Sequence, residues 1–277
     1  MGVRVPVDLK DSSTAALVEV ALSVGFEEFH RLMRYELDDL HSRYSDRFPN
    51  DEEKAPHKPF IEEPDGGLVA LPSASPITNI RRWFGSEDGS RLIQVQRNWF
   101  ARNWRVTVQD SGNGAIPLYP GYPALRADFA ESLGNFIDFV EDTNLGGFKP
   151  LQCEISYRLQ LQGGGLWDHP DELHRVAQMF SGRSGNYLPG LEAMRTITQY
   201  VIPDDDGRRV GRLYGRLETA RSKDGTDFLI LTVFARGAPI GDGVDGVFAF
   251  LDTGQQWIVN GIRDFLTLEA SEWYGLD

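Results

Sequence analysis

The chain has 277 residues, of which 41% are hydrophobic and 25% are charged, a composition typical of a globular protein with one large core or two smaller ones. Its 41 acidic and 28 basic residues give a formal net charge of −13, which disfavours a protein that binds nucleic acid over its whole surface. The single cysteine, Cys153, excludes an intramolecular disulfide and a metal site with several cysteine ligands; it fits a reducing compartment, and we expect a cytoplasmic protein.

The first predicted elements are a strand and a helix. Residues 17–24 alternate and are rich in β-branched side chains, which indicates a strand. The apolar stretch of residues 15–26 is short and interrupted by Glu19, so it indicates neither a signal peptide nor a membrane span. In residues 29–44 the apolar side chains recur at three- and four-residue spacing, as on one face of a helix. Residues 49–76 collect prolines, glycines and acids without an apolar period, and we expect an exposed loop there.

Antiparallel strands and a second helix complete the first half. Residues 80–108 alternate on both sides of Asp88-Gly89, a pair that supplies the positive φ of a tight hairpin turn. Residues 125–140 have helical spacing, and Gly146-Gly147 ends that segment. The order predicted for residues 1–145 is therefore β-α-ββ-α.

The second half, residues 146–277, repeats this order. A short helix is expected at residues 171–180, and strands are expected at residues 153–157, 196–202, 212–222 and 228–235. The run Thr253–Gln256 has the spacing of a capping box, in which the hydroxyl covers a free N–H at the start of a helix. We expect a last helix to begin there and to present an apolar face up to Leu266.

Three pairs of matching features lie at nearly equal offsets along the two halves. They are Glu19 and Glu154 (154 − 19 = 135), residues 86–90 and 222–226 (222 − 86 = 136), and residues 100–102 and 234–236 (234 − 100 = 134). We therefore expect an α+β fold of two pseudo-repeated units, 1–145 and 146–277, with antiparallel sheets and with helices packed on one face. The alternative is two unrelated α+β units that share common turn residues.

Several segments together resemble the signature of a sporadically distributed, uncharacterised bacterial protein family of about this length. They are residues 18–24, 83–89, 91–97, 100–104, 152–157 and 235–239. The family carries no established activity. Its patchy distribution implies horizontal transfer, which is common among toxin–antitoxin proteins and antiphage accessory proteins, so the resemblance implies a role of that kind.

Arginine-rich hairpins are the first candidate site. Residues 81–105 contain six arginines and two acids, and residues 208–236 contain seven basic and three acidic residues. Arginines between tryptophans can bind phosphate groups while the rings stack on bases. The candidate phosphate-binding or partner-binding residues are Arg91, Arg97, Arg102, Arg105, Arg236 and Trp104. The alternative is that these are solvent-facing strand positions paired with carboxylates.

Two histidines and two glutamates are further candidates. His30 and His41, about three helical turns apart, are weak candidates for proton transfer because imidazole titrates near neutral pH; they are alternatively boundary residues of an amphipathic helix. Glu19 and Glu154 lie in otherwise apolar strands, and we expect carboxylates near the pseudo-axis that pair with a repeated arginine such as Arg102 or Arg236. Outward-facing strand positions are the alternative.

No metal ligand set is predicted. The run Asp168–His174 lacks the spacing of a metal site and indicates a helix start instead. The glycine run at 163–165 lacks the residues of a phosphate-binding loop, and Asp204–Gly207 lacks the glutamate of a calcium loop; both favour turns.

The sequence favours a non-enzymatic binding protein that presents a pseudo-symmetric groove or sheet face to a macromolecular partner. The net charge favours a basic protein as that partner. The alternative is nucleic-acid or nucleotide binding by the arginine-rich hairpins, with RNA processing at His30 and His41; a small-molecule enzyme without a local motif stays open. No cofactor and no membrane contact is expected, and the oligomeric state is left open.

Overall fold

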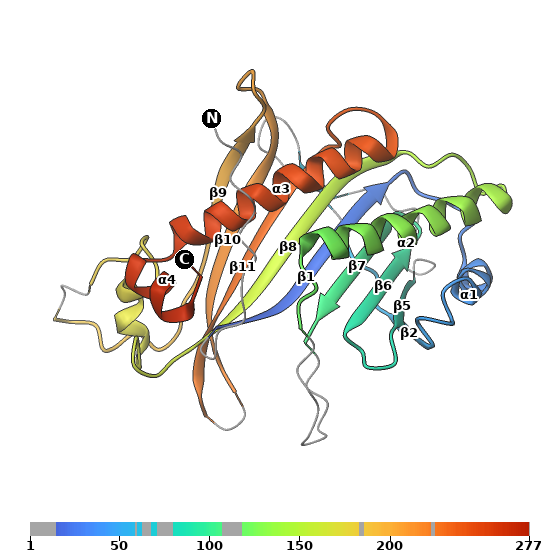
Figure 1. Cartoon of the computed structure of the whole chain (residues 1–277). Helices are drawn as coiled ribbons and strands as arrows, with labels where there is room; N and C mark the ends of the chain where they lie inside the picture. Colours follow the sequence, from blue (N-terminus) through green and yellow to red (C-terminus); the bar gives the residue numbers. More distant parts are fainter. Residues whose placement is uncertain are drawn as a thin grey trace.

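The computed structural model describes residues 15–58, 60–62, 68–70, 80–106, 118–182, 186–222 and 225–276. They form an α+β fold around one antiparallel nine-stranded sheet (Figure 1). In spatial order its strands are β2 (Asn50–Lys54), β5 (Arg81–Gly85), β6 (Arg91–Gln96), β7 (Trp99–Arg105), β1 (Ala15–Phe26), β8 (Pro150–Gln162), β11 (Asp227–Gly237), β10 (Arg209–Arg221) and β9 (Arg195–Pro203). Two short strands, β3 (Phe60–Glu62) and β4 (Leu68–Ala70), pair separately.

Two long helices cover one face of the sheet. Helix α2 (Tyr122–Asp142) packs on β7, and α3 (Gly243–Phe265) packs on β8, β10 and β11 (Figure 1). The short helix α1 (Arg34–Ser42) lies near β2 and β5, whereas η1 (Pro170–Arg175) and α4 (Leu268–Tyr274) lie at the other end of the sheet. Within the described part of the chain, no helix combines the length and the apolar character that crossing a membrane would need.

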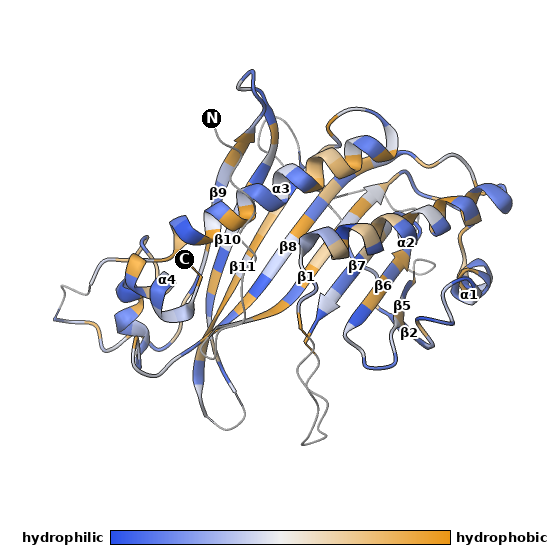
Figure 2. Cartoon of the chain, viewed as in Figure 1, coloured by the Kyte–Doolittle hydropathy of each residue, from blue (hydrophilic) through white to orange (hydrophobic). Residues whose placement is uncertain are grey.

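Alternation along the strands gives the sheet two different faces. In β8, the odd-numbered side chains from Cys153 to Leu161 are buried beneath the helices, while Glu154, Ser156 and Arg158 point the other way. Figure 2 shows this alternation as successive orange and blue segments along the strands. Because successive side chains of a strand point to opposite faces, the sheet has one apolar face under α2 and α3 and one polar face, called here the helix-free face.

The core is continuous across both halves of the chain. Strand β1 pairs with β8, and buried side chains from both halves form one cluster. The strand order outward from this pair is β1-β7-β6-β5 on one side and β8-β11-β10-β9 on the other. In each half, the strand at the centre comes first along the chain and the long helix follows the strand beside it.

The prediction of an exposed loop at residues 49–76 is wrong where the structure describes strands. Residues 50–54 form β2, an edge strand of the main sheet, and residues 60–62 and 68–70 form β3 and β4. Residues 59, 63–67 and 71–76 lie outside the described residues. Strand β2 escapes prediction because four of its five residues are charged, as suits an edge strand that pairs on one side only.

Three predicted helices have different bounds or character. Thr253 does not begin a helix: it lies within α3, where its hydroxyl donates to the carbonyl of Ala249 at 2.9 Å. The helix expected over residues 29–44 is helical only from Arg34 to Ser42, and the segment at 171–180 contains a 3₁₀ turn rather than an α-helix. The hairpin turns are confirmed, with φ of 69° at Gly89 and 78° at Gly207.

Candidate binding face of the sheet

The helix-free face carries more basic than acidic side chains. Strand parity and pairing place on it eight basic residues, Lys54, Arg81, Arg105, Arg158, Arg195, Arg212, Arg216 and Arg236, and four acids, Glu19, Glu52, Glu154 and Glu218. A fifth acid, Glu62, reaches it from β3. Its local balance is therefore opposite in sign to the net charge of the chain.

A cationic cluster surrounds Trp83 on the first-half side of this face. Lys54 Nζ and the guanidinium carbons of Arg81 and Arg105 lie 5.0, 5.4 and 5.2 Å from the centroid of the indole ring. Arg81 donates to the side chain of Gln94 at 3.1 Å, and burial lowers its pKa. Among the described residues, Arg81 and Arg105 have no carboxylate partner, and Arg81 Nε and Trp83 Nε1 are buried donors without an acceptor.

The second-half side of the same face contains a paired arginine on two stacked rings. Tyr214 and Phe234 lie 4.6 Å apart with an interplanar angle of 6°, and the guanidinium carbon of Arg236 lies 5.3 Å from the Phe234 centroid. Arg236 also forms an ion pair with Glu154 at 2.5 Å. Burial raises the pKa of Tyr214. The charge of Arg236 is therefore compensated, in contrast to the charges of Arg81 and Arg105 at Trp83.

One segment, residues 55–58 and 60–62, crosses the helix-free face and is called here the strap. The His57 amide donates to the side chain of Gln96 at 2.8 Å, and the Gln96 side chain donates back to the His57 carbonyl at 3.0 Å. The His57 ring lies 4.9 Å from that of Trp99. Burial is the main cause that lowers the pKa of His57; Arg81 and Arg236 lower it further, and Glu154 opposes them.

Glu62 attaches the far end of the strap. Its amide donates to Gln152 Oε1 at 2.5 Å, one carboxylate oxygen is paired with Arg212, and the other accepts from the Tyr214 hydroxyl at 2.6 Å. The Glu62 and Arg212 side chains are only 3% and 6% exposed. The strap is therefore held on the sheet by a buried ion pair.

The structure brings together only two of the six predicted phosphate-binding or partner-binding residues. Arg105 and Arg236 lie on the helix-free face. Trp104 is a core residue, Arg91 and Arg102 point to Asp128 of α2, and Arg97 is buried, donating to the His30 carbonyl at 2.5 Å. Charge density along the sequence selected these residues, but strand parity divides them between the two faces.

The two histidines have separate surroundings. His30 precedes α1 and is 73% exposed, whereas His41 lies in α1, where Nε2 is 2.8 Å from the Phe48 carbonyl and Nδ1 is 3.5 Å from Asp51. Neither lies on the helix-free face. The run at 168–174 does begin a helical turn, since His169 accepts from the Asp171 amide as its N-cap. Within the described ranges, no group of three metal-ligating side chains occurs.

The two glutamates have different partners. Glu154 pairs with Arg236, one of the two arginines expected for this role. Glu19 lies opposite Arg105 and Arg158 in the sheet but accepts from Asn103 at 2.7 Å; Arg102, the other arginine expected to pair, points to the opposite face.

Of the three pairs of matched sequence features, only Glu19 and Glu154 occupy equivalent positions in the two halves. Ala21 and Ser156 are opposite each other between β1 and β8, at the same offset as Glu19 and Glu154, so a twofold axis through that pair relates the two glutamates. The other matches fail: residues 86–90 join β5 to β6 whereas 222–226 join β10 to β11, and Phe100 packs on α2 whereas Phe234 lies on the helix-free face. Arg105 lies opposite Glu19 and Arg236 lies opposite Glu154, so strand pairing makes the two arginines counterparts.

Comparison with known proteins adds no identity. No protein-family model matches the chain, and no curated protein matches it. The resemblance to a sporadically distributed bacterial family therefore stays a prediction. Sequence reasoning placed Trp83 among the arginines of the candidate surface but did not select Arg81, Glu62 or Tyr214 as site residues. The alternation of Arg81 and Trp83 with Arg82 and Phe84 was the available signal for Arg81.

Proposed function

We propose that this protein is a non-enzymatic binding protein that presents its helix-free face to a macromolecular partner. The cluster at Trp83 is the observation that carries this proposal. Three cations share one indole ring, and within the described residues Arg81 and Arg105 lack a carboxylate partner. Arginines without a carboxylate partner favour an external group that supplies negative charge.

The partner is proposed to be a protein with an acidic segment. Net charge alone favours a basic partner, but the helix-free face has the opposite local balance, and local charge decides which surface can approach. A role as an antitoxin or an antiphage accessory is a setting in which such a partner would be found, and the resemblance supports that setting.

The non-enzymatic part of the proposal rests on the carboxylates of this face. Glu62 and Glu154 each pair with an arginine, so both carboxylates are engaged in ion pairs within the chain. Their contacts favour attachment of the strap over acid–base chemistry.

A second candidate function is nucleic-acid or nucleotide binding on the same face. Arginine and tryptophan side chains together suit phosphates and bases, and Arg158 is an exposed cation beside Glu19. RNA processing by the two histidines gains no support, because they lie apart from this face.

The test is a pull-down from the organism that carries the chain, followed by binding assays with variants. Mass spectrometry and absorbance at 260 and 280 nm separate a protein partner from a nucleic acid. With either one, Arg81→Gln combined with Arg105→Gln should weaken binding about tenfold or more. For a nucleic acid, the same change should also reduce the salt slope by about two.

Arg91→Gln is the matched control, because Arg91 is an exposed arginine that points toward α2. Its affinity should equal that of the wild type. If the double variant binds like the wild type, or if Arg91→Gln weakens binding as much, the helix-free face is not the binding surface.

We also propose that the two halves arose by tandem duplication. The mirrored strand order, the placement of α2 and α3 on one face, and the equivalent pairs Glu19–Arg105 and Glu154–Arg236 support it. Superposing β1 and β7 on β8 and β11 in this register should bring α2 onto α3. A superposition that leaves the helices apart would refute duplication.

A further inference from the structure

Strand β9 is an unprotected edge of the main sheet. It has nine residues, and among the described residues it pairs only with β10. Ile197, Tyr200 and Val201 are 56%, 47% and 44% exposed, and Arg195 is its only charged residue. The opposite edge, β2, is almost entirely charged, which is how proteins prevent a strand from pairing with another chain. Within the described part of the chain, Arg195 is the only charge that protects β9 in this way.

We propose that a second copy of this chain pairs with β9 in an antiparallel arrangement, through a twofold axis at Gln199. Residues directly opposite in an antiparallel pair lie on the same face, so the axis must pass through a residue position of the strand. An axis at Gln199 places Ile197 of each copy opposite Val201 of the other. Two exposed apolar pairs are then buried, and the two Gln199 amides meet.

The ends of β9 are charge-complementary in this arrangement. The Arg195 side chain is 78% exposed at the start of the strand, where it also contacts Glu218 at 2.9 Å. The strand runs at its end into the acidic turn Asp204–Gly207, where Arg208 pairs with Asp204 and Asp206 and the exposed Asp205 adds a further negative charge. Antiparallel pairing about Gln199 brings Arg195 of each copy beside the Asp204–Gly207 turn of the other. Two attractive charge contacts therefore offset part of the repulsion between two acidic chains.

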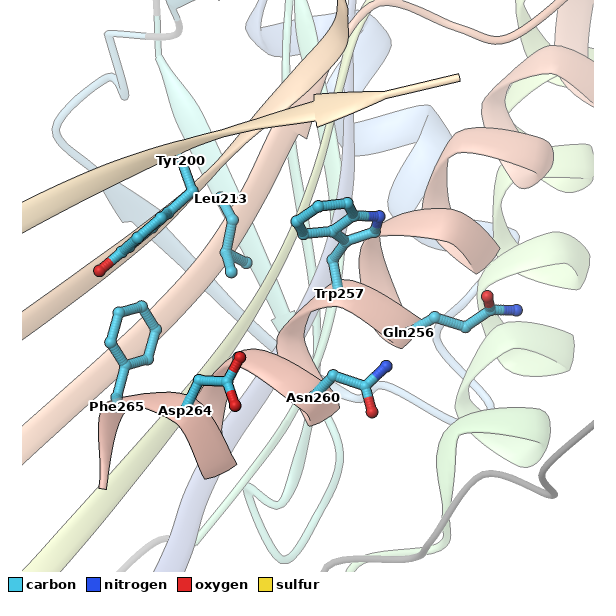
Figure 3. Close-up of a pocket in the computed structure, with 8 residues that line it drawn as sticks. Tyr200, Leu213, Gln256, Trp257, Asn260, Asp264 and Phe265 are labelled. Carbon is cyan, nitrogen blue, oxygen red and sulfur yellow. The ribbon is translucent and has the colours of Figure 1, made fainter. Parts of the chain in front are cut away.

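The other face of β9 also favours this register. Tyr200 borders a cavity of about 280 Å³ between β9 and α3, and its ring lies 5.6 Å from that of Phe265 (Figure 3). With the axis at Gln199, Thr198 of the second copy lies opposite Tyr200 and covers the exposed ring. An axis at Tyr200 would instead place each Val201 opposite a Gln199 amide, so that register is worse.

This inference is independent of the proposed function. It rests on the edge of the sheet, whereas partner binding rests on the helix-free face. Pairing at β9 would join two nine-stranded sheets into one, with the helix-free faces of both copies on the same side.

An engineered disulfide tests the register. Opposite residues of an antiparallel pair have Cα atoms about 4.5–5.5 Å apart, within the range that a disulfide spans. The native Cys153 is buried, so it leaves a clean background. With oxidised glutathione as the electron acceptor, Gln199→Cys should form a covalent dimer. Thr198→Cys, which would face Tyr200 of the other copy, should form no covalent dimer.

The mass in solution provides the second measurement. Light scattering should give the wild type twice its 31.1 kDa chain mass. Ile197→Lys should weaken the dimer at least about tenfold and keep the circular dichroism of the wild type. Tyr35→Lys, a control at an exposed aromatic residue in α1, should remain dimeric. A monomeric wild type, or equal cross-linking of both cysteine variants, would overturn the proposal.

Discussion

Neutralising Glu62 should release the strap from the sheet. The Glu62 and Arg212 side chains are 3% and 6% exposed, so Glu62→Gln would remove the negative charge of a buried ion pair. Breaking a buried ion pair by removing one charge costs about 3–5 kcal/mol. The glutamine retains an acceptor for the Tyr214 hydroxyl and therefore isolates the charge from the hydrogen bond.

Amide hydrogen exchange is the suitable assay, because the strap can detach while the sheet stays folded. The Glu62 amide donates to Gln152 and the His57 amide donates to Gln96, so exchange at both reports on strap opening. A loss of about 3 kcal/mol corresponds to exchange roughly 150-fold faster, since each 1.4 kcal/mol is a factor of ten. Global unfolding in urea should lose no more than this same free energy.

The control is Glu53→Gln, which removes one partner of an exposed ion pair with Arg34. Their side chains are 40% and 66% exposed, so the expected loss is below about 1 kcal/mol. Adding Arg212→Met to Glu62→Gln should restore most of the protection, because both charges of the buried ion pair are then removed. Unchanged exchange in Glu62→Gln would refute the view that the buried ion pair holds the strap.

Three further predictions concern stability. Burial lowers the pKa of His57, so the unfolded chain binds a proton at this residue more tightly than the folded chain does. The contribution of His57 to stability is therefore complete above about pH 6.5 and decreases as the pH falls. His57→Gln should flatten the acid dependence of strap exchange between about pH 7 and 5. Gly215→Ala would drive its Cβ into the Phe265 ring and should lower the free energy of unfolding in urea by about 1–3 kcal/mol. Gly134→Ala, with open space around it, should stabilise α2 by about 0.5–1 kcal/mol. Arg102→Met should be less destabilising than Arg102→Ala, because it retains the packing of the long side chain, and both should bind the partner as the wild type does.

Much of the sheet could be predicted because its strands show plain signals. Alternating side chains mark β1, β8, β10 and β11, and Asp-Gly turns mark the hairpins. The start of α3 could not be predicted, since Thr253–Gln256 has the composition of a helix start yet lies in the middle of a helix that tertiary packing extends back to Gly243. Strand β2 has no apolar residue to reveal it.

The site was harder to predict than the fold because charge density carries no information about direction. In β7, Arg102 alternates in phase with Phe100 and Trp104, two bulky apolar residues, which places it on the core side. Arg105 is out of phase with them and faces outward. Reading parity before charge would have separated the two arginines, because a shift of one residue moves a side chain to the other face.

The same parity argument shows where the halves differ in use. Glu19 and Arg105 occupy the ladder positions of Glu154 and Arg236, yet only the second pair forms an ion pair. In the first half, Glu19 accepts from Asn103 and Arg105 stacks on Trp83 instead. Arg236 is therefore compensated within the chain by Glu154, whereas its counterpart Arg105 has no carboxylate partner among the described residues. A partner with negative charge, as proposed above, would therefore meet an uncompensated arginine beside Trp83.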